Sequence, residues 1–138
     1  MVKIKLSNLG DEKMVERGLL KPEQVRTLEV EGLVDTGATA LALPADVVEA
    51  LGLTEIRRVD IGLADGTRRQ VPVVDGLTIE ILGRGMSGDA FVLPAGSTPL
   101  IGQIELERLD LVVNPKSREL MTNPAHPDGP VLDLLRVA

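Results

Sequence analysis

Short apolar runs separated by Gly, Pro and Asp recur along the whole chain of 138 residues. This spacing is typical of an all-β domain, in which brief strands alternate with turns. We therefore expect strands over residues 1–6, 25–34, 40–43, 59–63, 70–74, 77–82, 89–93, 109–113, 118–121 and 131–137. The segment 99–102 is apolar and ends in Gly.

Helices are expected at only a few places in this pattern. The best candidate is 44–51, because Pro44 suits a first helical turn and Gly52 can cap the end. Shorter helical segments are expected over 103–108 and within 12–17. The sequence predicts no repeat and no linker, so we expect a single domain over 1–138, with a core of about 24–122 and a C-terminal tail over 123–138.

Turn signals fix how several strands connect. Asp65 and Gly66 lie between the runs 59–63 and 70–74, and an Asp-Gly pair in this position is a strong hairpin signal. A glycine-rich turn over 83–88 is expected to join the next two strands.

Composition narrows the possible functions. Hydrophobic residues make up 43% of the chain, with one Phe and no Trp or Tyr, so the core must be aliphatic. The lack of aromatics argues against base stacking, and the net charge of -6 argues against a surface that follows phosphates. Arg57, Arg58, Arg68 and Arg69 form two small basic pairs that we interpret as a solvated strand face.

Cysteine is absent and histidine occurs once, as His126 in a Pro-rich tail. Disulfides, thiolate metal sites and histidine-rich metal sites are therefore excluded, and no metal or organic cofactor is implied. The lack of a signal-peptide pattern or of a long apolar run favours a cytoplasmic protein with no membrane contact. Hydrolytic chemistry would have to depend on carboxylates.

One carboxylate has a distinctive setting. Asp35 opens the motif Asp-Thr-Gly-Ala, with Gly-Leu-Val before it and Thr-Ala-Leu-Ala-Leu after it. The apolar flanks predict a buried turn, where a carboxylate needs hydrogen bonds or a proton. The alternative is a turn residue that only bonds its local backbone.

The chain resembles the retropepsin-like aspartic proteases, most closely the small bacterial stand-alone members. The resemblance covers about 24–122 and rests on three elements in the same order: Leu-Val-Asp-Thr-Gly-Ala at 33–38, the Asp-Gly hairpin at 64–66, and Leu100-Ile101-Gly102 before a short helix. It implies a closed, mostly antiparallel β barrel with one or two short helices and a flap hairpin over a cleft. It also implies a homodimeric endopeptidase that cleaves peptide or protein substrates.

In such a dimer, the two copies of Asp35 would meet at the two-fold axis around one water. Two carboxylates this close cannot both ionise easily, so they share a proton and titrate as a pair. By the resemblance, Thr36 would link the two catalytic loops, and the Gly37 N–H would bond the carboxylate. Ala38 offers no hydroxyl to the carboxylate, which predicts a less acidic optimum than in pepsin-like enzymes.

The resemblance assigns the remaining site residues. Ala64, Asp65 and Gly66 would form the flap tip, although a plain surface hairpin is the alternative. Leu100, Ile101 and Gly102 would pack behind the catalytic loop. The terminal runs 1–6 and 131–137 are candidates for an intersubunit sheet.

Two rival functions remain open at this point. The same fold could be a catalytically silent module that binds peptides or dimerises, or the motif could be incidental in a structural protein. A paired-acid glycosidase has no supporting context, because the acidic residues Asp46, Glu49, Glu105 and Glu107 are interpreted as solvated helix faces.

Overall fold

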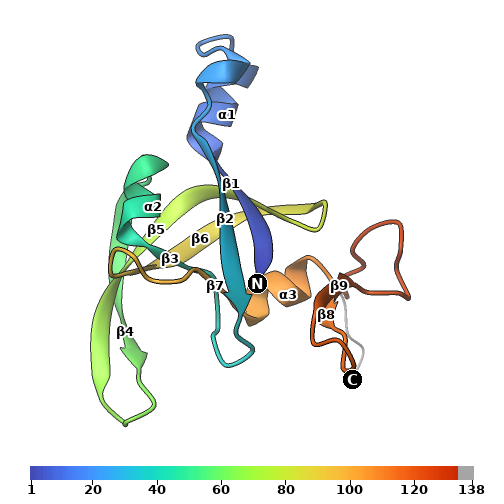
Figure 1. Ribbon diagram of the computed structural model, residues 1–138. Coiled ribbons are helices and arrows are strands. Elements are labelled where there is room, and N and C mark those ends of the chain that lie inside the picture. Colours follow the sequence, from blue (N-terminus) through green and yellow to red (C-terminus); the bar gives the residue numbers. More distant parts are fainter. Residues whose placement is uncertain (134–138) are drawn as a thin grey trace.

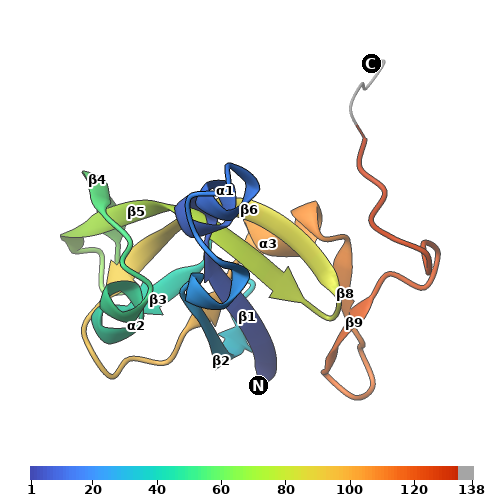
Figure 2. The same cartoon turned by 90° about the horizontal axis from the view of Figure 1, so that it is seen from above.

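The computed structural model describes residues 1–133, and most of them belong to one seven-stranded sheet that closes on itself. The strands follow the order β1-β2-β7-β3-β6-β5-β4, and a further pairing of β1 with β5 closes six of them into a barrel. Figures 1 and 2 show this barrel with the β4–β5 hairpin extending from it. The strands of the sheet are β1 (Val2–Asn8), β2 (Thr27–Val34), β3 (Ala42–Pro44), β4 (Glu55–Gly62), β5 (Arg68–Ile81), β6 (Arg84–Leu93) and β7 (Leu100–Ile101).

The interior of the barrel is aliphatic, as the composition requires. The fully buried hydrophobic side chains come from most of the barrel strands and from the segments beside them: Ile4, Leu6, Leu41, Leu43, Leu51, Leu77, Ile79, Ile81, Ile101 and Leu109. Burial of a Leu or Ile side chain contributes about 1.5–3 kcal/mol, so this set accounts for much of the driving force for folding. The prediction of an all-β barrel is confirmed.

Strand β7 lies between β2 and β3 and joins two parts of the chain that are distant in sequence. It pairs in parallel with β2, Leu33 opposite Leu100 and Val34 opposite Ile101, and in antiparallel with β3. Strand β3 in turn pairs in parallel with β6. The loop that leaves β2 is therefore enclosed by backbone on the β3 and β7 sides.

The described part of the chain holds three short α-helices, α1 (Leu9–Glu16), α2 (Ala45–Ala50) and α3 (Gln103–Arg108), and a 3-10 turn over Pro22–Gln24. All three lie at or next to the helical segments expected from the sequence, and α1 begins three residues before the expected 12–17. Pro44 precedes α2, and Gly52 follows it with φ +66°, as the capping argument requires. No helix within residues 1–133 has the length and apolar character needed to cross a membrane.

Helix α1 occupies the long connection between β1 and β2 and stands above the barrel in Figure 1. Asn8 caps it by accepting a bond from the Asp11 N–H and donates its own amide to the carbonyl of Leu51. Asp11 accepts two side-chain bonds from Arg26, at 2.8 and 2.9 Å, and these bonds lower the pKa of Asp11. The base of this insertion is thus attached to the barrel.

Three expectations about strands and turns need correction. The connection between β5 and β6 is the two-residue turn Leu82–Gly83 rather than 83–88, because β6 already begins at Arg84. Strand β1 is internal where Lys5–Ser7 pair with both β2 and β5, so those residues have no free edge for a partner. Of the expected strand 131–137, residues 131–133 form no strand, and the rest lies outside the described residues.

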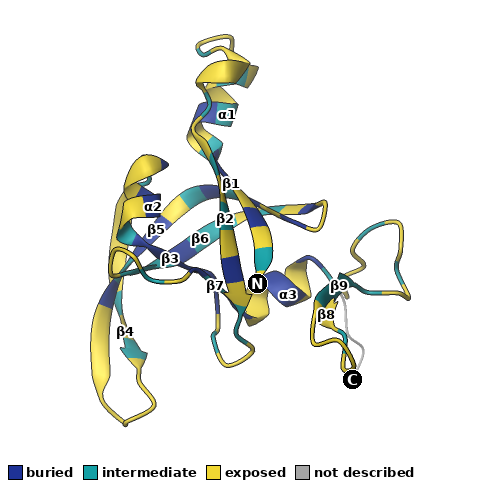
Figure 3. Ribbon diagram, in the orientation of Figure 1, coloured by how far each residue is buried: buried dark blue, intermediate teal, exposed yellow. Residues whose placement is uncertain are grey.

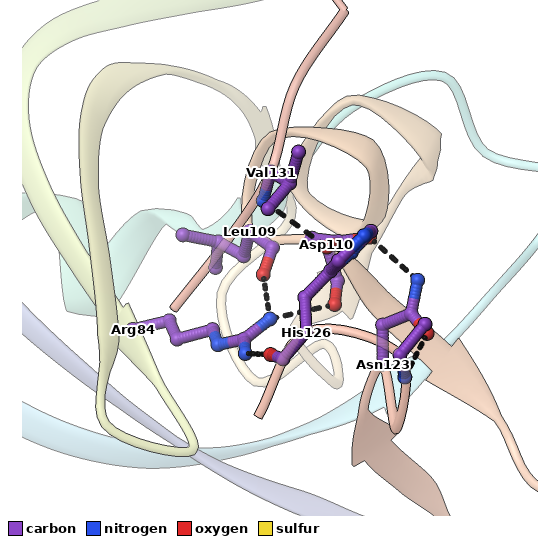
Figure 4. Close-up of polar contacts among 7 residues, drawn as sticks. Arg84, Leu109, Asp110, Asn123, His126 and Val131 are labelled. Atoms are coloured by element: carbon purple, nitrogen blue, oxygen red, sulfur yellow. Dashed lines mark hydrogen bonds and ion pairs between the residues drawn. The ribbon is translucent and has the colours of Figure 1, made fainter. Parts of the chain in front are cut away.

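A small hairpin follows α3, made of β8 (Leu111–Val113) and β9 (Leu120–Thr122). Next to it, Asp110 accepts bonds from Asn123 at 3.0 Å and from the Val131 N–H at 3.2 Å, and contacts His126 Nδ1 at 2.5 Å (Figure 4). Bonds from Asn123, Val131 and His126 hold the pKa of Asp110 at about 2. This cluster attaches the tail to the barrel.

The same cluster contains a buried cation. Arg84 donates to the carbonyl oxygens of Leu109 and Asp110, at 3.1 and 2.9 Å, and also to that of His126. His126 was expected in the tail, and its backbone and ring both help to fasten that tail.

Candidate active site

Asp35 is the first residue after β2, and backbone bonds fix its position. Its N–H donates to the carbonyl of Ile101 at 2.9 Å, which continues the β2–β7 pairing by one residue. Its own carbonyl accepts from the Ala38 N–H at 3.0 Å and so closes a turn. The Gly37 N–H donates to the Asp35 side chain at 2.9 Å. The loop therefore holds the carboxylate by main-chain groups.

The carboxylate is less enclosed than the sequence suggested. Asp35 and Ala38 are half-buried, whereas Thr36 and Gly37 are exposed. The flank after the turn leads into the buried strand β3, but Leu33 before the turn is 47% exposed and the turn itself lies at the barrel surface. Within one chain, then, Asp35 stays open to solvent on one side.

The start of α3 lies directly behind this loop. The N–H groups of Gln103 and Ile104 donate to the carbonyls of Ala38 and Thr39, at 2.9 and 3.0 Å. The Gln103 side chain also donates to the carbonyl of Thr36 at 2.8 Å. This role of Gln103 could not be predicted, because a Gln at the first position of a helix carries no distinctive signal.

Gly102 is the closest approach between these two parts of the chain. A Cβ atom at this position would lie 2.5 Å from the backbone nitrogen of Ala40 and 2.7 Å from its Cα, distances that only glycine permits. Ile101 is fully buried beside it, and Leu100 is half-buried. The structure thus brings all three residues against the loop that carries Asp35.

The β4–β5 hairpin carries the predicted flap tip away from the barrel and is largely exposed (Figure 3). Asp65 accepts bonds from the Thr67 N–H and hydroxyl, at 2.9 and 2.5 Å, and these bonds lower its pKa. Gly66 follows with φ +84° and donates its N–H to Leu63. Ala64, Asp65 and Gly66 therefore form a tight, exposed turn.

A cleft of about 780 Å³ connects the loop and the hairpin. Asp35 lies on its wall, Val59 and Ile61 line it from β4, and Val73 and Phe91 line it from β5 and β6. Phe91 is the only aromatic residue of the chain, and sequence analysis did not single it out. The arrangement can bind an extended apolar ligand beside a carboxylate.

An ion pair lies on the wall of this cleft. Arg57 on β4 contacts Asp89 on β6 at 3.2 Å, and both residues line the cleft. Nearby, Arg58 pairs with Glu55 at 2.8 Å. The side chains of both pairs are about half exposed, and solvent-accessible pairs of this kind contribute roughly 0–1 kcal/mol. Their effect is on the polarity of the cleft more than on stability.

Glu105 is the clearest error of the sequence interpretation. It was expected on a solvated helix face, but its side chain is only 1% exposed. It accepts a bond from the Gly102 N–H at 3.1 Å, so the start of α3 turns it inward. Glu107, two positions on, is exposed as expected. A six-residue helix has too little periodicity to show which of two nearby acids points inward.

Among residues 1–133, no group of three or more His, Asp or Glu side chains is placed to hold a metal ion. Comparison with protein-family models finds one that is described as aspartyl protease and matches residues 23–104. That range includes the loop, the hairpin and the start of α3, and it is more than half of the chain. No curated protein matches the sequence.

Proposed function

Because the chain belongs to the aspartyl protease family, retropepsin-like in fold, we propose that it is a homodimeric endopeptidase in which two copies of Asp35 activate one water. The observation that carries this proposal is the geometry of Asp35. Its carboxylate lies on the wall of an apolar cleft, with its backbone bonded to β7 and one oxygen bonded to Gly37. Each chain supplies one Asp-Thr-Gly motif, so a pair of carboxylates needs two chains.

The surface around Asp35 supports a dimer. Leu33 and Ile104 flank the loop, and in the single chain they are 47% and 46% exposed, respectively. A second copy at this face would cover both of them and would also remove water from around the two acids. Two-fold contacts of this kind place the same residue of each chain at the axis.

In the proposed reaction, the ionised member of the pair takes a proton from the water, which attacks the carbonyl of the peptide bond. The protonated member donates a hydrogen bond to the carbonyl oxygen. As the C–N bond breaks, the proton taken from the water passes to the leaving nitrogen, so the pair again holds one proton. The β4–β5 hairpin closes over the substrate, which lies extended against it and bonds to its backbone. Val59, Ile61 and Phe91 would receive apolar side chains of the substrate.

Ala38 places no hydroxyl near the Asp35 carboxylate, so we expect a pH optimum less acidic than in pepsin-like enzymes. A peak near pH 2 would contradict this expectation. The proposal includes a cytoplasmic site of action, which a chain without cysteines fits.

Cleavage of a denatured protein and of a peptide library, at several pH values, tests the activity. We expect wild type and the exposed control Asp75→Asn to cleave, and Asp35→Asn to be inactive. Activity that survives Asp35→Asn would rule out the aspartic mechanism. Peptide binding without cleavage at any pH would favour a silent module.

Mixing subunits tests the shared site. When wild type and Asp35→Asn exchange subunits at equal concentration, activity per wild-type chain should fall to about half, because random pairing places half of the wild-type chains in mixed dimers. An unchanged activity per wild-type chain would mean that each chain works alone. Sedimentation of wild type should show a dimer.

A further inference from the structure

Glu105 is the most deeply buried polar side chain in the described part of the chain, at 1% exposure. Its position is the third residue of α3, where its carboxylate oxygen accepts the Gly102 N–H at 3.1 Å. A capping residue does not need such burial, because most acidic residues in a first helical turn stay in contact with water. The burial therefore calls for a reason beyond helix capping.

The surroundings of Glu105 connect it to the loop that carries Asp35. The residue it caps, Gly102, is followed by Gln103 and Ile104, whose N–H groups hold the carbonyls of Ala38 and Thr39. On its other side, the N–H of Leu41 is close enough to favour the charged form of Glu105. One side chain thus lies between the start of α3 and the segment that leaves the loop.

The electrostatic setting of this carboxyl favours its neutral form. Burial raises the pKa of Glu105 above its usual value, and the charge of Asp89 on β6 raises it further. The N–H groups of Gly102, Glu105 and Leu41 oppose this rise only in part. Asp89 is itself paired with Arg57, which limits its influence.

We propose that Glu105 is a positioning residue for Asp35, because its buried side chain bonds the start of α3 where Gln103 and Ile104 hold the catalytic loop. The proposal rests on the proposed peptidase function for its effect on rate. When Glu105 loses its proton, the buried charge draws water toward the start of α3. The bonds from Gln103 and Ile104 to the loop then weaken, and the two copies of Asp35 lose their alignment.

This arrangement has a definite direction with pH. A carboxyl with a raised pKa in the folded protein stabilises the fold below its unfolded pKa, and that contribution is lost as the pH rises through the folded pKa. The loop is therefore held most firmly in acid, where a pair of carboxyls that shares one proton is also active. Glu105 would make the enzyme lose activity toward neutral pH.

Glu105→Gln tests the proposal, because glutamine keeps the shape and the acceptor oxygen but cannot ionise. Glu107→Gln is the matched control on the exposed face of the same helix. Three readouts are compared in wild type and both variants between pH 4 and pH 8: the melting temperature, the exchange protection of the Asp35 and Ala38 amides, and kcat/KM.

For Glu105→Gln we expect a melting temperature and a loop protection that fall less than in wild type as the pH rises. The alkaline limb of its kcat/KM profile should move to higher pH, because the buried carboxyl no longer ionises. Glu107→Gln should follow wild type in all three measurements.

Superimposable profiles for wild type and Glu105→Gln would overturn the proposal and leave Glu105 a simple cap. Failure of Glu105→Gln to fold would overturn it as well, because a neutral isostere should be tolerated. An inactive wild type would overturn the peptidase function, while melting and exchange would still decide whether Glu105 controls the loop.

Discussion

Asp110 and Asp35 lie at different places on the barrel, and they differ in the hydrogen bonds that their own chain donates to each carboxylate. Asp110 receives bonds from Asn123 and Val131 and contacts His126, so both of its oxygens are engaged. For Asp35, the contacts within residues 1–133 include one bond to the side chain, from Gly37. Asp110 is only 15% exposed as a side chain, whereas Asp35 faces the cleft.

This difference separates a structural acid from the acid that we propose to be catalytic. The donors around Asp110 stabilise its charge so strongly that its pKa lies at about 2, and a group held in this way is a poor base near neutral or mildly acidic pH. Asp35 keeps one oxygen available for a water or a second carboxyl. A fixed loop with one carboxylate oxygen left available is what the proposed role of Asp35 requires.

The largest expected effect tests this distinction directly. Asp35→Asn should lower kcat by roughly 10³-fold or more, because it removes a general acid-base group. Asp110→Asn should leave kcat within a few-fold of wild type at temperatures where both proteins are folded. Steady-state kinetics on one peptide substrate would measure both. Comparable losses in the two variants would break the comparison.

The next effect concerns the contact that fixes the position of Asp35. Gly102→Ala would bring a Cβ to 2.5 Å from the Ala40 nitrogen and 2.8 Å from its carbonyl carbon, and backbone cannot move aside as a side chain can. We expect a loss of about 1–3 kcal/mol in the free energy of unfolding, as for other overpacked sites, together with loss of activity. Denaturant unfolding and kinetics would measure the two.

Gly10→Ala provides a reference for this prediction, since its Cβ would meet only the end of the Asn8 side chain, at 3.1 Å. That variant should retain activity. If Gly102→Ala were as stable and as active as Gly10→Ala, close contact between α3 and the loop would not be what positions Asp35.

Much of this arrangement could be predicted from the sequence, and the rest depended on tertiary contacts. Turn signals are local, so the hairpin at Asp65-Gly66 and the helix after Pro44 were confirmed where expected. The internal place of β1 could not be predicted, because pairing with both β2 and β5 depends on how the barrel closes. The burial of Glu105 and the bonds around Asp110 depend on residues far apart in sequence for the same reason.

A third effect follows from the charge of Asp110. Because its pKa is lowered in the folded protein, the stability it contributes is present above its usual pKa near 3.8 and is lost as the pH falls toward 2. The melting temperature of Asp110→Asn should therefore lie below that of wild type at pH 6, and the two should converge as the pH approaches 2. Thermal unfolding across this range measures the difference.

Asp128→Asn is the control for this measurement, an exposed acid in the same tail. Its melting temperature should equal that of wild type at every pH. If the melting temperatures of wild type and Asp110→Asn differed by the same amount at every pH, the cluster would stabilise the fold through its packing and not through its charge. That result would weaken the contrast with Asp35.

The smallest effect extends the comparison to the flap tip, where Asp65 is satisfied locally by Thr67. By the same criterion Asp65 is structural, and its role is to shape the turn with Gly66. Gly66→Ala places a side chain at φ +84°, which costs roughly 1–2 kcal/mol in the left-handed region. We expect the free energy of unfolding to fall by an amount in this range and kcat/KM to fall more than kcat, since a distorted tip binds the substrate backbone less well.

Gly62→Ala is the matched control on the same hairpin, because its φ is not in the left-handed region and no atom lies within 4 Å of the added Cβ. It should change neither stability nor kcat/KM appreciably. If Gly66→Ala also left kcat/KM unchanged, the tip would not contact the substrate. Residues 64–66 would then be a surface hairpin without a role as a flap. The substrate would then be bound by the walls of the cleft alone.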